Sequence, residues 1–280
     1  MDEKSLGQRL QLARQKSGLT QQQLCQKSGL SYSTLAKIER GAIKSPSIFT
    51  IQQIASVLGL GLDELVGASP SISGSEGKQK SKSGVSFVYF DVNGCLVRFF
   101  HGAFNKLAED SGAPADMIET AFWHYNDAVC SGKMNMEDFN AALGEHLGMK
   151  KLDWASYYLH AVAPIKEMQE LIVWASKSYH VGLLTNIMPG LLDVMKQRGV
   201  IPDIAYTAVI DSSEVGCIKP DRQIFEIASQ RSGFPPEEIL LIDDSRTNIM
   251  AAERLGWHVL WFDDFEPTAS VARVRTALEL

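Results

Sequence analysis

Hydrophobic positions in the first 66 residues recur at helical spacing. Leu6, Leu10 and Ala13 would share one face of a helix, and the apolar positions within residues 51–58 follow the i, i+3, i+4, i+7 rule. Gly59 is placed to end the second of these helices. We therefore expect an all-α domain at residues 1–66.

From residue 85 onward, short apolar runs alternate with helical patterns. The runs predicted to be strands are Val85–Val92, His180–Thr185, Ala205–Ile210, Ile239–Asp243 and His258–Phe262. Apolar strands separated by helices are typical of a parallel sheet that is covered on both faces. Residues 85–280 are therefore predicted to form a three-layer, Rossmann-like α/β domain.

One long interval after the first strand contains only helical patterns. The helices predicted there are Ala103–Ser111, Asp116–Cys130, Met136–Leu147 and Asp153–Ala161. An all-helical stretch of this length does not fit the alternation of the sheet. We interpret residues 98–163 as a helical cap inserted beside the sheet after its first strand.

Residues 67–84 separate the two predicted domains. The stretch reads GASPSISGSEGKQKSKSG, with one isoleucine as its only large apolar residue. Such a composition cannot bury an apolar surface and favours a flexible linker.

The charge distribution and the cysteines narrow the class of protein. The net charge is −6, yet residues 1–66 hold 8 Lys and Arg against 5 Asp and Glu. A basic end on an acidic body is common where one end of a protein binds phosphate backbones.

The four cysteines form no CxxC pair, which fits a reducing cytoplasm and disfavours a structural zinc site. Because no apolar run approaches a membrane span and no signal peptide is visible, we expect a cytoplasmic protein with no membrane partner.

Two short, capped helices meet at a tight turn in the first domain. Thr20 and Gln23 have the spacing of a capping box, and Ser31 caps the next helix. Gly29 supplies a permissive backbone between the two helices. Helices joined in this way match the DNA-reading helix-turn-helix.

The stretch from about Ser5 to Val66 resembles the phage-repressor-like (Xre-type) helix-turn-helix family over its five-helix length. The pieces that carry the resemblance are LTQQQL, SYSTLAKIERG and LGLGLDEL. The resemblance implies that the third helix enters the major groove of double-stranded DNA, and that the protein binds as a homodimer. Near the start of that helix the candidate contacts are Tyr32, Ser33 and Thr34, with Lys37 one turn later.

Three further residues of this domain are candidates for the DNA backbone. Gln21 begins the second helix and could direct a backbone amide and its own side chain at a phosphate. Arg14 and Lys44 are candidate charge partners of the phosphates. For each, the alternative is a solvated surface residue.

Polar residues follow the strands of the second domain where each strand ends. Asp91 ends the first strand, Thr185-Asn186 the second and Asp243-Asp244 the fourth, while Lys219 follows in CIKPD. Because parallel strands present their carboxyl ends at one edge, these groups should gather in one crevice. Carboxylates bind Mg²⁺ through oxygen, and the hydroxyl and ammonium groups can neutralise phosphoryl oxygens.

This set resembles the four motifs of the haloacid dehalogenase (HAD) superfamily, in order and spacing. The resemblance implies that Asp91 is the nucleophile, that Thr185, Asn186 and Lys219 bind phosphate, and that Asp91, Asp243 and Asp244 hold Mg²⁺. It also places Asn248 behind the acidic pair and identifies the helical insertion with the family's cap. The similarity covers about residues 85–262.

One departure from the family pattern concerns Asn93. Phosphatases of the family carry a second aspartate at this position, which protonates the leaving alcohol and then activates water. An amide cannot do this, and general acid–base catalysis typically contributes about 10²–10⁴-fold. Dehalogenase-type members also lack this aspartate, so Asn93 weakens the phosphatase interpretation without removing it.

Three interpretations follow. The domain binds a phosphorylated or other anionic metabolite with Mg²⁺ and little turnover; or it is a working phosphatase attached to a DNA-binding module; or its motifs are a relic and it only dimerises. The fusion to a DNA-binding domain favours the first, which describes a transcriptional regulator.

Aromatic and histidine side chains of the cap could also bind an apolar ligand, although packing is the more common role for such residues. The residues concerned are Phe100, His101, Trp123, His124 and Tyr125.

Overall fold

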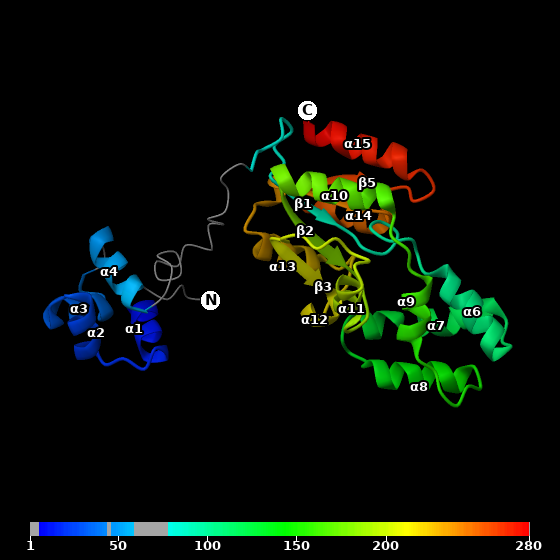
Figure 1. Cartoon of the computed structure of the whole chain (residues 1–280), viewed down its shortest axis with the longest axis horizontal. Coiled ribbons are helices and arrows are strands. Elements are labelled where there is room, and N and C mark those ends of the chain that lie inside the picture. The colour runs from blue at the N-terminus through cyan, green and yellow to red at the C-terminus, as the bar shows by residue number, and fades with distance from the viewer. Residues whose placement is uncertain (1–5, 44–45, 59–77, 280) are drawn as a thin grey trace. The chain divides into compact units, whose positions relative to one another are not determined.

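A computed structural model describes residues 6–43, 46–58 and 78–279 of the chain (Figure 1). The chain divides into two compact units, residues 1–75 and 76–280. No helix within the described ranges is long and apolar enough to cross a membrane.

The first unit is a cluster of short helices. Its described helices are α1 (Leu6–Lys16), α2 (Gln21–Ser28), α3 (Tyr32–Glu39) and α4 (Ile48–Leu58). Their apolar faces meet in one core that includes Leu10, Leu24, Leu35 and Ile54, each almost fully buried. A fifth helix, implied by the family resemblance, would fall at residues 59–66 and lies outside the described residues.

The turn between α2 and α3 has the predicted local chemistry. The Thr20 side chain accepts a hydrogen bond from the Gln23 amide while the Gln23 side chain accepts one from the Thr20 amide, which completes the capping box. Gly29 follows α2 with φ of 71°, a left-handed conformation that costs glycine little. Ser31 accepts from the Thr34 amide and so caps α3.

The second unit is built on a five-stranded sheet with every neighbouring pair parallel. Its strands are β1 (Phe87–Phe90), β2 (His180–Thr185), β3 (Ala208–Asp211), β4 (Ile239–Asp243) and β5 (His258–Trp261). The strand order is β3-β2-β1-β4-β5. The predicted parallel Rossmann-like sheet is therefore present, with β1 at its centre.

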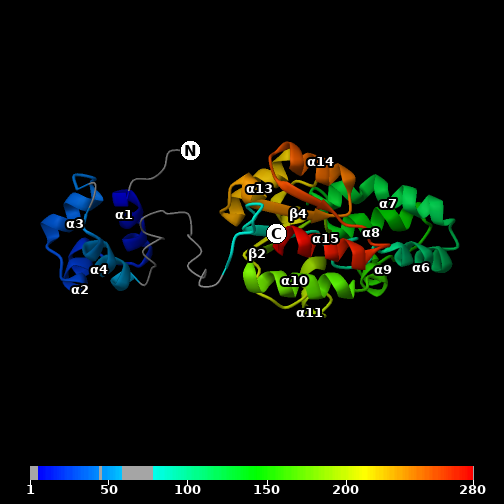
Figure 2. The same cartoon turned by 90° about the horizontal axis from the view of Figure 1, so that it is seen from above.

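Helices cover both faces of this sheet, as Figure 2 shows from above. On one face, Phe87 and Tyr89 pack with residues of α13 and α14. Val88 and Phe90 point to the opposite face and pack with α10, α11 and α15. The bounds of the covering helices are α10 (Lys166–Ser178), α11 (Leu191–Gln197), α12 (Ser212–Val215), α13 (Arg222–Ser232), α14 (Arg246–Arg254) and α15 (Pro267–Glu279). Alternation along β1 thus supplies one residue set to each of two cores.

The register of the central strands aligns their ends. Phe90 pairs with Leu183 on β2 and with Ile242 on β4. Asp91, Thr185 and Asp243 consequently emerge at one edge of the sheet. The predicted bounds of β2 and β4 are confirmed, whereas β3 begins at Ala208 and ends at Asp211.

The insertion between β1 and β2 is a helical subdomain, as predicted. It comprises α6 (His101–Ser111), α7 (Ala115–Cys130), α8 (Met136–His146) and α9 (Trp154–Ala161). Aromatic rings fill its interior, with Phe104, Phe122, Phe139 and Trp154 fully buried and in mutual contact. In Figure 1 this cap extends beyond the end of the sheet at which β1 and β2 finish.

The predicted linker at residues 67–84 needs correction at its C-terminal end. Residues 67–77 lie outside the described part of the chain, but residues 78–84 pack against the second unit. Gln79 donates its amide to the Ser178 carbonyl over 2.7 Å, and Lys80 pairs with Glu238 at 2.6 Å. Ser81 is buried and accepts from the Val85 amide. Hydrogen bonds and an ion pair, rather than apolar side chains, fix this Gly/Ser/Lys-rich segment in place.

Candidate functional site

Three carboxylates converge at the carboxyl edge of the sheet. Asp91 follows β1, Asp243 ends β4 and Asp244 comes next, and one oxygen from each lies within 4.8 Å of the others. Asp91 and Asp243 are buried, whereas Asp244 is partly exposed. The structure thus brings together the carboxylates that the sequence singled out, in a geometry suited to one shared divalent cation.

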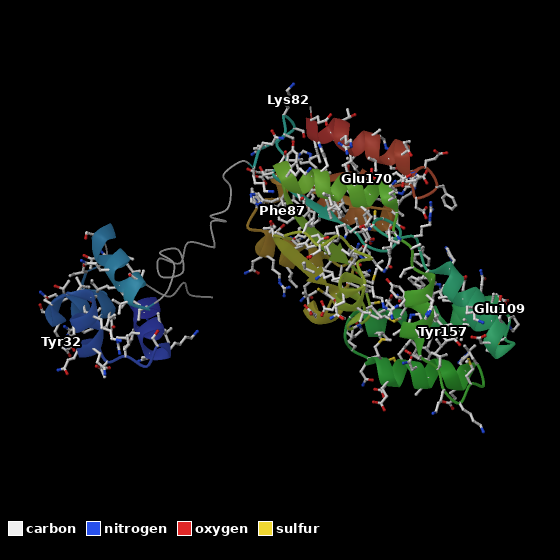
Figure 3. All side chains as sticks on the ribbon, in the orientation of Figure 1. Tyr32, Lys82, Phe87, Glu109, Tyr157 and Glu170 are labelled. Atoms are coloured by element: carbon white, nitrogen blue, oxygen red, sulfur yellow. The ribbon has the colours of Figure 1, made fainter. Side chains whose placement is uncertain are left out.

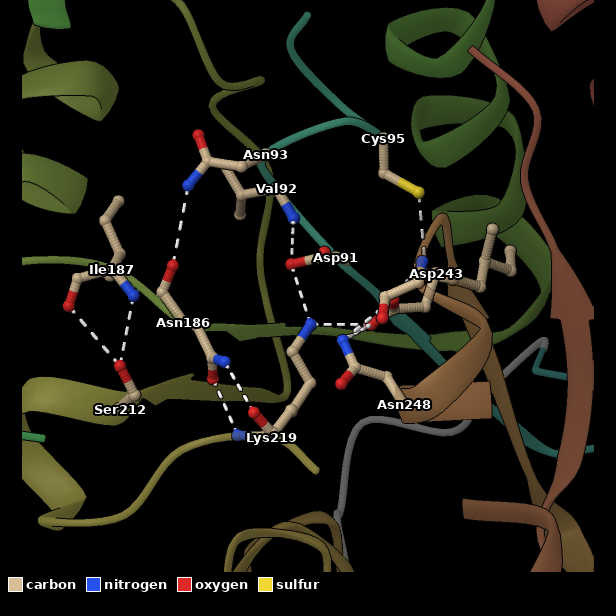
Figure 4. Close-up of polar contacts among 12 residues, drawn as sticks. Asp91, Val92, Asn93, Cys95, Asn186, Ile187, Ser212, Lys219, Asp243 and Asn248 are labelled. Carbon is tan, nitrogen blue, oxygen red and sulfur yellow. Dashed lines mark hydrogen bonds and ion pairs between the residues drawn. The ribbon is translucent and has the colours of Figure 1, made fainter. Parts of the chain in front are cut away.

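Lys219 supplies the positive charge of this cluster. Its Nζ lies 2.9 Å from Asp91 Oδ1 and 2.6 Å from Asp243 Oδ2, and its side chain is 1% exposed (Figure 4). The side chain of Asn186 fixes the lysine backbone, because Asn186 Oδ1 accepts from the Lys219 amide and Nδ2 donates to its carbonyl. Asn186 therefore acts on Lys219 as well as standing at the end of β2.

Asp243 is held by further donors at the start of α14. Asn248 Nδ2 donates to both carboxylate oxygens, at 3.0 and 3.2 Å, and the Ser245 amide donates to Oδ1 over 2.8 Å. Asn248 thus stands behind the acidic pair as the resemblance implied. These contacts fix the orientation of the Asp243 carboxylate. Asp243 is therefore held more firmly than its neighbour Asp244.

Burial and charge crowding govern the protonation of the site. Burial raises the pKa of Asp91 to about 8, with the nearby Asp243 and Asp244 adding to the rise and Lys219 opposing it. The pKa of Asp244 rises to about 6 because of its own burial and the charge of Asp243. Burial alone would lower the pKa of Lys219, yet the carboxylates outweigh it and raise that pKa. One ammonium among three carboxylates leaves an excess of negative charge that a divalent cation would relieve.

Thr185 carries the clearest sign of a missing ligand atom. Its Oγ1 is fully buried at the end of β2 and has no hydrogen-bond partner among the described residues. Buried hydroxyls without partners are costly and therefore uncommon. A phosphoryl oxygen beside Asp91 and Lys219 would supply this partner. The residues therefore fit a Mg²⁺ ion together with a phosphate group.

The backbone beside Asp91 leaves no room for a side chain at residue 94. Gly94 has φ of 81°, and a Cβ at this position would lie 2.1 Å from Asp244 Oδ2. Both the left-handed backbone and the close approach require glycine. The chain after β1 can thereby pass directly over the acidic pair.

Asn93 is engaged by the cap. Its Oδ1 accepts a 2.6 Å hydrogen bond from the hydroxyl of Tyr158 on α9, while its Nδ2 lies 3.5 Å from the Asn186 carbonyl. Tyr158 is 2% exposed. Tyr158 carries no signal of this role in the sequence, because helical packing alone accounts for an aromatic residue on α9.

Other cap aromatics have separate roles. Phe100 is buried among Phe104, Phe122 and Trp154. His101, Trp123 and His124 are exposed, and Tyr125 is partly buried. Of the five aromatic and histidine residues considered from sequence, Phe100 borders the space between cap and core.

The candidate DNA-reading face lies on α3. Tyr32 is 53% exposed and visible at the surface in Figure 3. Ser33 and Lys37 are also exposed and Thr34 is partly so, whereas Leu35 and Ile38 face the core. The hydroxyls of Ser33 and Thr34 both lie within hydrogen-bond distance of the Ser31 hydroxyl. The predicted contact residues on α3 are therefore exposed or partly exposed.

Arg14 does not have the role expected from sequence. Its guanidinium pairs with Glu39 at 2.7 and 3.0 Å and donates to the Leu19 carbonyl, and the residue is 8% exposed. The bond to Glu39 raises the pKa of Arg14 despite its burial. We correct the assignment of Arg14 from a phosphate contact to a bridge between α1 and α3.

Gln21 and Lys44 are the other two candidates for contact with the DNA backbone. Gln21 is partly buried and its Nε2 donates to Glu39 over 2.7 Å, so the side chain already has an anionic acceptor within the fold. The backbone amide at the start of α2 stays a candidate contact. Lys44 lies outside the described residues.

Comparisons with known proteins agree with this division of the chain. Residues 10–65 match the helix-turn-helix family model and residues 86–256 match the haloacid dehalogenase-like hydrolase model. Over 148 residues the chain is 26% identical to D-ribitol-5-phosphate phosphatase of Bacteroides thetaiotaomicron, covering 49% of this chain and 68% of that protein. Over 78 residues it is 37% identical to the immunity repressor protein of Bacillus phage phi105, covering 28% and 54%.

A solved structure shares the fold of the second unit. The HAD family enzyme bt-2542 from Bacteroides thetaiotaomicron, determined as a magnesium complex, superposes with a TM-score of 0.58 at 18% identity, covering 68% of this chain and 98% of that one. The chain spans between 26% and 68% of the length of the first curated relatives that it matches.

Proposed function

Because the chain belongs to the haloacid dehalogenase-like hydrolase family and carries a helix-turn-helix domain ahead of that module, we propose that it is a DNA-binding transcriptional regulator. Its HAD-like domain binds a phosphorylated or other anionic small molecule together with Mg²⁺ and hydrolyses it weakly or not at all. The protein acts in the cytoplasm.

One observation carries the ligand-binding half of the proposal. The site has its full set of anion-binding and cation-binding groups, including the unpartnered hydroxyl of Thr185, but Asn93 stands where an acid would be needed. A side-chain amide has no proton of useful acidity for a leaving alcohol. The arrangement favours holding a phosphate over cleaving its ester.

Each residue of the site then has a role in binding. Asp91, Asp243 and Asp244 would hold Mg²⁺, which supplies charge neutralisation for phosphoryl oxygens. Lys219 would donate to one phosphoryl oxygen, and the hydroxyl of Thr185 to another. Lys219 keeps its charge because two carboxylates surround it. Asn186 holds the lysine backbone in place for this contact.

The DNA-binding half rests on α3. Its exposed face carries Tyr32, Ser33, Thr34 and Lys37, residues able to contact bases or phosphates in a major groove. Proteins of this kind commonly bind two related half-sites as a symmetric pair, so we propose a homodimer on double-stranded DNA.

A gel-shift experiment tests the regulatory proposal. We expect the full chain to retard fragments that flank its own gene, and Lys37→Ala to weaken that binding while leaving the fold intact. Adding Mg²⁺ and inorganic phosphate should change the affinity, because the HAD-like domain is proposed to sense an anion. Absence of retardation at low salt would count against the regulator.

A Mg²⁺-dependent phosphatase is the second candidate, favoured by the complete metal and phosphate groups and by the similarity to a phosphatase. In that case Asp91 would be the nucleophile, and the DNA-binding module would only localise or assemble the enzyme. Rapid turnover of phosphate esters by the wild-type chain, without DNA binding, would favour this candidate over the regulator.

A further inference from the structure

A small cavity lies between the cap and the core, with Asn93 and Asn186 among the residues that line it. It is partly open and offers about 20 Å³ to a water-sized sphere. A cavity needs roughly 10–15 Å³ by this measure to hold one water molecule. The space between cap and core therefore accepts a group of one or two non-hydrogen atoms when the cap is in this position.

Rigid side chains set the size of this cavity. On the cap side it is bordered by Phe100, Phe122 and Trp154, whose rings pack against one another with centroids 4.6 to 5.8 Å apart. On the core side Leu191, at the start of α11, is 3% exposed. Close-packed rings cannot yield space without displacing their neighbours.

A polar contact ties the cap to the core at the same place. Tyr158 on α9 donates to Asn93 Oδ1 over 2.6 Å, and its hydroxyl also lies 3.4 Å from the sulfur of Met195 on α11. Any movement of α9 away from the sheet must break the bond to Asn93 and the contact with Met195, so separation of the cap from the core carries a free-energy cost.

From this cavity we infer the size class of the ligand. The HAD-like site selects inorganic phosphate or a phosphate with an organic part of one or two carbon atoms, and Tyr158, Trp154 and Leu191 determine that selection. Larger phosphate esters bind after the cap separates from the core. The inference rests on the proposed function, since it concerns the ligand of the same site.

Calorimetric titration of the full chain with Mg²⁺ tests the inference. The probes are inorganic phosphate, methyl phosphate and glycerol 3-phosphate. We expect methyl phosphate to bind within about threefold of inorganic phosphate, and glycerol 3-phosphate to bind at least about tenfold more weakly, since opening the cap costs on the order of one buried hydrogen bond.

Two pairs of variants separate cavity size from general effects. Leu191→Ala enlarges the cavity and should reduce the discrimination against glycerol 3-phosphate severalfold. Leu192→Ala is its control, because Leu192 is equally buried, at 3% exposure, but does not border the cavity. Tyr158→Phe should also reduce the discrimination. Tyr157→Phe should not, because its hydroxyl donates a hydrogen bond to Asp110 on the cap instead.

The outcomes distinguish the inference from the proposed function. Equal affinity of the wild-type chain for inorganic phosphate and glycerol 3-phosphate would overturn the size selection and leave anion binding standing. A failure of all three probes to bind would overturn both. Equal loss of discrimination in Leu191→Ala and Leu192→Ala would show that the cavity wall does not set the selection.

Discussion

The hydroxyl of Tyr158 donates a 2.6 Å hydrogen bond to Oδ1 of Asn93, so the cap binds the residue that stands at the acid–base position of the family. The amide accepts from the tyrosine with its oxygen, and its nitrogen faces the Asn186 carbonyl. A carboxyl group at residue 93 would accept the same hydrogen bond from Tyr158. That bond would favour its ionised form and lower its pKa.

Asn93→Asp should raise the hydrolysis of an aryl phosphate by at least about tenfold, because it restores a group able to donate and accept a proton. Since Tyr158 would hold the new carboxyl group in its ionised form, the double variant Asn93→Asp/Tyr158→Phe should be faster still. Initial rates at saturating p-nitrophenyl phosphate measure both, so that weak binding of this larger ester does not enter the comparison. Wild-type hydrolysis at ordinary enzyme rates would refute the proposal of weak turnover.

Asp244→Asn should weaken Mg²⁺ binding by at least about tenfold, because it removes a charged oxygen ligand from the cluster. Loss of a residue that only supports a metal ligand already costs about tenfold or more in affinity, and loss of a ligand should cost more. Asp264→Asn is the matched control, since Asp264 adds negative charge near Asp244 but lies outside the carboxylate trio. Calorimetric titration with MgCl₂ compares them. Similar affinities for both variants would indicate that the metal binds elsewhere.

Mg²⁺ affinity should rise with pH between about 6 and 8. Without metal, burial and neighbouring carboxylates raise the pKa of Asp91 to about 8 and that of Asp244 to about 6, so protons occupy these ligands below those values. Mg²⁺ must displace these protons in order to bind. The affinity for Mg²⁺ therefore rises by up to about tenfold per pH unit for each proton released. Titrations in buffers of different ionisation enthalpy count the protons. A pH-independent affinity with no proton release would contradict the protonation scheme.

Arg14→Ala should lower the free energy of unfolding of the N-terminal domain by about 3–5 kcal/mol, because it leaves the Glu39 carboxylate buried without its partner. The two side chains are 10% and 2% exposed in the native pair. Lys37→Ala, on the exposed face, should leave stability within about 0.5 kcal/mol of wild type but weaken DNA binding. Denaturant unfolding and gel shifts separate the effects. A stable Arg14→Ala variant that fails to bind DNA would restore the phosphate-contact assignment.

Sequence patterns located the chemistry of the second domain because it lies at strand ends. Apolar runs that stop at Asp91, Thr185 and Asp243 mark the carboxyl edge of a parallel sheet, and β2 and β4 have their predicted bounds. The predicted bounds of the third strand are less accurate. Apolar composition placed it at residues 205–210, whereas Tyr206 bonds the Pro202 carbonyl and the strand begins at Ala208.

Contacts between distant residues could not be predicted in the same way. Arg14 and Glu39 are 25 positions apart, and Tyr158 and Asn93 are 65 apart. A charged residue on a helix looks like a surface residue, and a tyrosine in a helical cap looks like packing. The anchoring of residues 78–84 also depends on Ser178 and Glu238, far along the chain.

The attachment of residues 78–84 fixes the point where the HAD-like domain meets the chain that leads to the DNA-binding domain. Gln79 and Lys80 bond beside the residues that open β2 and β4, while the ligand groups stand where those strands finish. An anion bound as proposed would therefore not touch residues 78–84. Coupling between the proposed ligand and DNA binding would have to pass through the sheet or through a second copy of the chain, and the proposed homodimer supplies the second route.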